Sequence, residues 1–233
     1  MSTDRRPTLF SGVLAVVAAT AGTAAVAETQ PLAVGAVAVG VGALLFVAGA
    51  TVARSRSRVF GTLLVLISLG TAAGGAGYGA SLATDQLHIA VVAPGMVGVF
   101  FVAFGVAPLR GSGSRRFVKM ASWLVFLSPV LSAGMSYTEP SNLMDVARIL
   151  GATVAAALVW DLGENSVSLG RQVGRRATTF WNETVHGVGS VLVGAVSAGG
   201  AYVAFGFGTG GQPLEGVVVL LVAIVLLVAF LHR

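Results

Sequence analysis

Cysteine is absent from the 233-residue chain, and charged residues are scarce. The lack of cysteine excludes disulfide bonds, thiolate metal ligands and cysteine nucleophiles. Asp, Glu, Lys and Arg make up only 10% of the residues, whereas a soluble domain has about 25%. A globule with so few charges could not cover its surface with polar groups. The apolar excess therefore indicates a protein whose surface faces lipid.

Long apolar runs fill most of the sequence and predict an all-α, polytopic membrane helix bundle. A helix that crosses a bilayer needs about 20 apolar residues, and prolines such as Pro31 and Pro140 interrupt the runs. We expect eight spans, at about residues 9–27, 32–53, 59–82, 87–109, 117–137, 143–160, 184–207 and 216–231. They form one transmembrane domain over residues 1–233, with a short amphipathic polar segment at residues 161–183.

The first apolar run has two interpretations. Ala25, Val26 and Ala27 precede Glu28 in the manner of a signal-peptide cleavage site. The run of residues 9–27 is longer than the apolar part of a signal peptide, which has about 7–15 residues. We therefore favour a retained first helix. Cleavage would leave seven spans in the same orientation.

The basic residues set the expected orientation. If both termini lie inside the cell, thirteen of the fourteen Lys and Arg residues fall on the inner side, and only Arg148 falls outside. Because Lys and Arg gather in cytoplasmic loops, the chain is predicted to be a multi-pass protein of the cell membrane with both termini inside. The same bias explains the net charge of +5, so no binding to nucleic acid is expected.

Small residues four apart mark helix faces that can pack closely in lipid. The third span has Gly70 with Gly74, and Gly75 with Gly79, while the seventh has Ser190 with Gly194. These patterns predict that the third and seventh spans lie at the centre of the bundle. The eighth span has few small residues and is expected to face lipid over much of its surface.

Charged residues are missing from the middle of every predicted span, which argues against ion-coupled transport. The nearest candidate for an intramembrane polar pair is Asp145 with Arg148, spaced i,i+3 on the sixth span. One interpretation is a polar site that faces the bundle interior. The favoured one is a snorkelling Arg148 at the outer rim, paired with Asp145 or Glu139.

Catalytic and metal-binding patterns are absent from the sequence. His186 and Ser190 share a helix face, but no carboxylate stands at a fixed spacing to orient them as base and nucleophile. No HExxH motif, metal-ligand cluster or phosphate-binding glycine loop occurs. The single lysine, Lys119, lies in a loop and so cannot hold retinal in the last span. We expect a protein that is not an enzyme and has no cofactor or metal.

The longest polar interval runs from Trp160 to His186. At 100° per residue it has an apolar stripe, a glycine stripe and a charged edge, which is the pattern of an amphipathic helix. Three interpretations remain open: a docking surface for a partner helix, an interfacial helix anchored by Trp160 and Trp181, or a bent continuation of the sixth span. The candidate partner-contact residues are Asp161, Glu164, Gly170, Arg171, Gly174 and Arg175.

This interval also carries a resemblance to a known family. Asp161-x-Gly163-Glu164, followed by Leu169-Gly170-x-Gln172-x-Gly174-Arg175, resembles a segment of an uncharacterised family of haloarchaeal multi-pass membrane proteins. Genes of that family tend to lie near genes for AAA-type ATPases and von Willebrand factor A-like proteins. The resemblance implies an accessory role in a membrane-associated assembly and supplies no catalytic residues.

Two functional hypotheses follow from these patterns. The first is a non-enzymatic accessory or scaffold subunit that binds a protein partner through residues 160–186 on the cytoplasmic side. The alternative is a small-solute transporter or channel with Asp145 and Arg148 near its path. An intramembrane enzyme ranks third. The basic loops could also bind anionic lipid headgroups, although their role in setting topology is sufficient to explain them.

Overall fold

The computed structural model describes residues 7–83, 85–108, 113–135, 143–172 and 180–207. These residues form helices and turns without a strand. The helices are α1 (Leu9–Ala25), α2 (Gln30–Ser55), α3 (Arg58–Ser81), α4 (Gln86–Val106), α5 (Arg115–Met135), α6 (Leu143–Gln172) and α7 (Phe180–Phe207). The all-α prediction is confirmed, and each of the first seven predicted spans contains a helix. The predicted eighth span, residues 216–231, lies outside the described residues.

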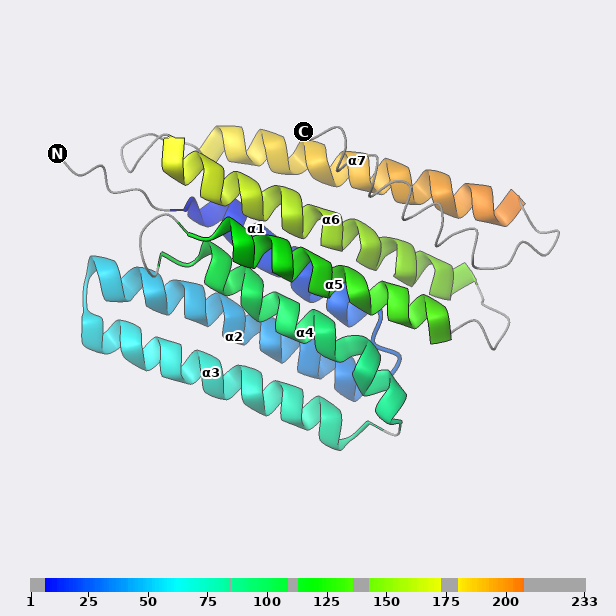
Figure 1. The fold of residues 1–233 in the computed structure, drawn as a ribbon, viewed down its shortest axis with the longest axis horizontal. Coiled ribbons are helices and arrows are strands. Elements are labelled where there is room, and N and C mark those ends of the chain that lie inside the picture. Colours follow the sequence, from blue (N-terminus) through cyan, green and yellow to red (C-terminus); the bar gives the residue numbers. More distant parts are fainter. Residues whose placement is uncertain (1–6, 84, 109–112, 136–142, 173–179, 208–233) are drawn as a thin grey trace.

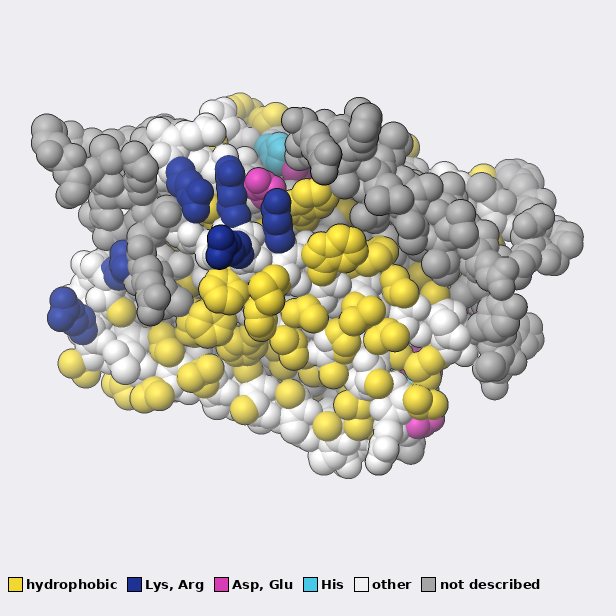
Figure 2. Space-filling view, in the orientation of Figure 1, with side chains coloured by type: hydrophobic (Ala, Val, Ile, Leu, Met, Phe, Trp, Pro, Cys, Tyr) yellow, Lys and Arg dark blue, Asp and Glu magenta, His cyan; other side chains and the backbone are white. Residues whose placement is uncertain are grey.

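Six of these helices, α2 to α7, are long and apolar enough to cross a membrane, and α1 is a shorter apolar helix. This is the architecture of a multi-pass membrane protein. Figure 1 shows the helices packed side by side, with successive helices running in opposite directions. Apart from Arg148, the described Lys and Arg residues therefore fall at one end, which we call the basic end (Figure 2). They are Arg54, Arg56, Arg58, Arg115, Arg116, Lys119 and Arg171.

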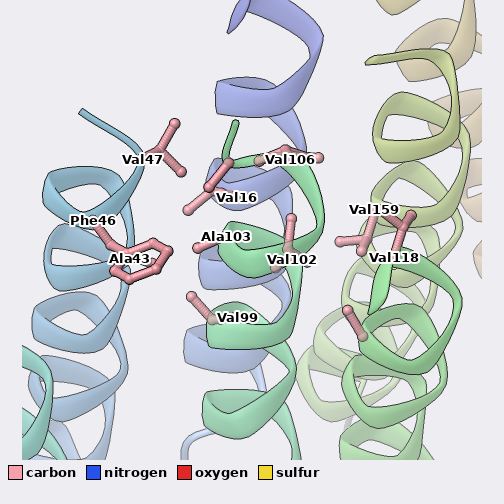
Figure 3. Close-up of a cluster of buried hydrophobic side chains, with 14 of the residues drawn as sticks. Val16, Ala43, Phe46, Val47, Val99, Val102, Ala103, Val106, Val118 and Val159 are labelled. Atoms are coloured by element: carbon pink, nitrogen blue, oxygen red, sulfur yellow. The ribbon is translucent and has the colours of Figure 1, made fainter. Parts of the chain in front are cut away.

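Helix α1 lies at the centre of the bundle and contacts α2, α4, α5, α6 and α7. Its core positions are small or β-branched, and Ala15, Val16 and Ala19 are fully buried. Figure 3 shows Val16 among the side chains of α2 and α4, and shows Val118 of α5 facing Val159 of α6. Because lipid is as apolar as these side chains, the helices are held by close van der Waals packing.

The prediction that the third and seventh spans are central is wrong. Helices α3 and α7 lie on opposite sides of the bundle and are the least buried of the candidate spans (Figure 1). In α3, Gly75 and Gly79 face α2, whereas a Cβ at Gly70 or Gly74 would have no atom within 4 Å. Small residues permit close packing without requiring it, so in a chain with 32 glycines some of them face outward.

The α2–α3 pair is packed on small residues spaced seven apart, a longer period than that of the i,i+4 pairs in the third span. The opposed positions are Gly35 with Gly75, Gly42 with Ser68, and Gly49 with Gly61. A Cβ at Gly42 would lie 2.7 Å from the carbonyl oxygen of Ser68, and a Cβ at Gly35 would lie 2.7 Å from that of Gly75. The two backbones are therefore in direct contact, as small residues permit in membranes.

Helix α6 continues through Trp160 to Gln172, and α7 begins at Phe180. The predicted boundary after residue 160, and the separate segment from 161, therefore differ from the structure. Among the three interpretations of this interval, continuation of the sixth helix is the one that matches as far as Gln172. At about 1.5 Å per residue, α6 is about 45 Å long, whereas the apolar layer of a bilayer is about 30 Å thick. One end of α6 must extend beyond that layer.

The glycine contacts of α2 and α3 predict opposite effects for two matched substitutions. In a helix interior, Gly→Ala alone is stabilising by up to about 1 kcal/mol. We expect Gly70→Ala to leave the thermal unfolding temperature in detergent unchanged or raised, because the added methyl group meets open space. We expect Gly42→Ala to lower it, because the methyl group forces α2 away from α3, at a cost of about 1–3 kcal/mol. Equal shifts for the two variants would contradict the packing.

Candidate functional site

A polar network joins α1, α6 and α7 at the basic end of the bundle. Its members come from parts of the sequence that are far apart, and most are partly or fully buried. They are Thr8 and Ser11 at the start of α1, Asp161, Asn165 and Ser166 in α6, and Glu183, His186 and Ser190 in α7.

Glu183 is the most deeply buried charged residue of this network, with an exposed fraction of 2%. Its Oε2 atom accepts hydrogen bonds from the backbone N–H of Ser11 at 2.8 Å and from the Ser11 hydroxyl at 2.9 Å. Ser11 lies in the first turn of α1, where backbone N–H groups have no partner within the helix. Thr8, the N-cap residue, makes no side-chain cap bond. Glu183 therefore caps α1 from α7, where the helix dipole also favours a negative charge.

The continuation of α6 holds the same end of α1. The backbone N–H of Thr8 donates to the Ser166 carbonyl at 3.0 Å, and the Ser166 hydroxyl donates to the Thr8 carbonyl at 2.7 Å. The Asn165 amide donates to the Ser11 hydroxyl at 3.2 Å. These bonds satisfy backbone groups that would otherwise be buried without partners, so residues beyond Trp160 are part of the folded bundle.

Asp161 links α6 to α7. Its Oδ2 atom lies 2.9 Å from Nε2 of His186 and 2.5 Å from the hydroxyl of Ser190. The structure thus places a carboxylate, that of Asp161, beside His186 and Ser190, for which the sequence showed no carboxylate at a fixed spacing. His186 does not stand between the other two groups, as it would in a serine–histidine–aspartate relay, because both meet the same oxygen of Asp161. The geometry is that of a bridge between two helices.

Glu164 and Gly170 also face other parts of the chain. Glu164 accepts a hydrogen bond from the Trp160 indole at 3.0 Å and lies 3.6 Å from Nε of Arg115 in α5. Gly170 is buried. Asp161, Glu164 and Gly170 are thus engaged within the molecule.

Arg171 is exposed, whereas Gly174 and Arg175 lie outside the described residues. Of the six candidate partner-contact residues, Arg171 is the one that the described part of the chain presents at its surface.

The Asp145–Arg148 pair lies at the opposite end of α6. The two side chains are partly exposed and their charged atoms are 3.9 Å apart. They border a small hollow of about 20 Å³, which is also lined by Val26, Glu28 and Ser132. Such a volume holds about one water molecule. Within the described ranges, no three His, Asp or Glu side chains are grouped to hold a metal ion.

Sequence reasoning missed Ser11 and Glu183, although both are buried members of the network. They are 172 positions apart, so no spacing rule connects them. The sequence does show that α1 has no acidic residue in its first turn, but only the structure shows that Thr8 makes no side-chain cap bond. Such a helix start needs an acceptor from elsewhere when it is buried.

The network predicts a graded response at Glu183. We expect Glu183→Ala to destabilise the protein by about 1–3 kcal/mol, because it leaves the Ser11 N–H buried without an acceptor. Glu183→Gln keeps an acceptor oxygen and should cost less. Thermal unfolding in detergent measures both, and hydrogen exchange should show the loss at the start of α1. An unchanged unfolding temperature for Glu183→Ala would contradict the role as a cap.

Comparison with known proteins identifies a family. Neither a curated protein nor a solved structure matches the chain. Residues 70–228 match the Family of unknown function (DUF7519). The matched range contains Asp161, Glu183 and the other network residues of α6 and α7, and it agrees with the resemblance to an uncharacterised family. Because the match covers more than half of the sequence, the chain belongs to this family of unknown function.

Proposed function

We propose that the protein is a non-enzymatic accessory or scaffold subunit of the cell membrane. In this proposal the basic end lies in the cytoplasm, in keeping with the positive-inside rule. A protein partner binds there, on the exposed part of the region from Trp160 to His186. The resemblance to the haloarchaeal family, with its neighbouring ATPase genes, favours a partner from a membrane-associated assembly.

The observation that carries this proposal is the exposed surface beside the buried network. Trp181 is 72% exposed, Phe180 is also exposed, and Arg171 is exposed at the end of α6. Tryptophan and arginine are the residues most enriched among those that dominate binding energy at protein interfaces. The hydrogen bonds between α1, α6 and α7 hold the helices that carry these residues. The surface is thus presented on rigid elements, which lowers the entropy lost on binding.

The alternative of a small-solute transporter or channel has less support. It places the path near Asp145 and Arg148, where the hollow has room for about one water molecule. Both side chains are partly exposed at the end of the bundle. This is the position expected of a snorkelling arginine at the rim of the membrane.

Copurification tests the proposal. The protein is solubilised in a mild detergent and the proteins bound to it are identified by mass spectrometry. We expect a stoichiometric partner that is lost in Arg171→Glu and Trp181→Ala, because both side chains are exposed and neither supports the described fold. Arg56→Glu is the matched control, since it makes the same charge change at another exposed arginine of the basic end. Gly170→Leu is less informative, because Gly170 is buried.

Two outcomes would overturn the proposal. One is a monomeric protein that carries no partner in any mild detergent. The other is solute flux in liposomes that Arg148→Ala abolishes, which would support the transporter instead. Retention of the partner in both Arg171→Glu and Trp181→Ala would move the contact to a different surface.

A further inference from the structure

A second surface at the basic end is formed by the start of α5. Arg115, Arg116 and Lys119 lie in its first five residues, all three are exposed, and the first turn contains no acidic residue. In the described part of the chain, the Glu164 carboxylate lies 3.6 Å from Arg115 and also accepts a hydrogen bond from the Trp160 indole. We call Arg115, Arg116 and Lys119 the α5 basic turn.

The position of these cations is electrostatically unfavourable within the helix. The start of a helix carries the positive end of the helix dipole, which disfavours Lys and Arg there. Arg54 is different, because it lies in the last turn of α2, where the dipole favours a cation. Arg58 stands at the start of α3 and is placed like the α5 cations, but it is a single cation, whereas α5 has three within its first five residues. The α5 basic turn therefore presents the denser positive charge to an external anion.

An apolar surface continues along α5 from these cations. Met120, Trp123, Leu127 and Leu131 are exposed at helical spacing, and Trp123 is 65% exposed. Figure 2 shows Lys and Arg side chains gathered at the basic end, next to a broad apolar surface. From Lys119 to Leu131 the helix rises about 18 Å, close to the thickness of one apolar leaflet of about 15 Å.

This order of chemistry matches one kind of molecule. Cations come first, then a tryptophan at the level where aromatic residues prefer to lie in membranes, then an apolar stripe. A phospholipid has the same order, with a phosphate, a glycerol region and acyl chains. We propose that the α5 basic turn and the stripe below it bind an anionic phospholipid, with its phosphate at Arg116 and Lys119. This inference does not depend on the protein partner.

Binding to defined lipids tests the proposal. Purified protein in uncharged detergent is titrated with phosphatidylglycerol or phosphatidylcholine, and bound lipid is measured by native mass spectrometry. We expect the protein to prefer phosphatidylglycerol. The double substitution Arg116→Gln with Lys119→Gln should weaken its binding about 30-fold, which equals about 2 kcal/mol at about 1.4 kcal/mol per tenfold. Added salt should also weaken it, because exposed charges are screened.

Two matched variants serve as controls. Arg56→Gln with Arg58→Gln removes two exposed cations from the α2–α3 turn and should retain the lipid. Arg116→Lys with Lys119→Arg keeps both charges and should bind as the unchanged protein does. Equal losses in the two Gln pairs would show diffuse attraction and overturn the proposal. Displacement of the lipid by an equal concentration of inorganic phosphate would also overturn it, since the apolar stripe would then contribute nothing.

Discussion

The continuation of α6 beyond Trp160 is the constraint on which the basic end of the bundle depends. It brings Ser166 to the start of α1 and Asp161 to α7. Without it, Thr8 and Ser11 would lose hydrogen-bond partners in a place where burial makes an unsatisfied group costly. Part of the polar segment between the sixth and seventh spans therefore packs within the bundle. Only the remainder can contact other molecules.

The rest of the bundle follows from the weak forces available in lipid. Burial of apolar side chains gains little there, so the closest contacts between backbones are made where small residues of two helices face each other. The α2–α3 pair shows this at Gly42, and Gly163 does the same in α6, where a Cβ would lie 2.6 Å from a methyl group of Val118. Glycine lowers helix propensity by about 1 kcal/mol, and close contact of this kind offsets the loss. Larger side chains on α3 and α7 are left to face outward.

The sequence was sufficient to predict the helices and the segregation of charge, because long apolar runs and arginine positions are local signals. It did not predict which helices are central. Gly70 and Gly75 are each followed by another glycine four residues later. Even so, Gly75 faces α2, whereas Gly70 faces open space. The sequence also did not predict the hydrogen bond between Ser11 and Glu183, because that bond depends on how α1, α6 and α7 pack together. The sixth helix extends past the predicted end at residue 160 because apolar and glycine positions continue its packing face as far as Gly170.

One distance tests the central claim that α6 is a single helix beyond Trp160. Because the chain has no cysteine, spin labels can be attached to cysteines placed at Arg148 and Arg171, which are both exposed on α6. Double electron–electron resonance in lipid nanodiscs then measures their separation. A continuous helix predicts about 35 Å between the two Cα positions, at about 1.5 Å per residue. A separate segment that turns onto the headgroups after Trp160 would give about 25 Å or less, and would contradict the account.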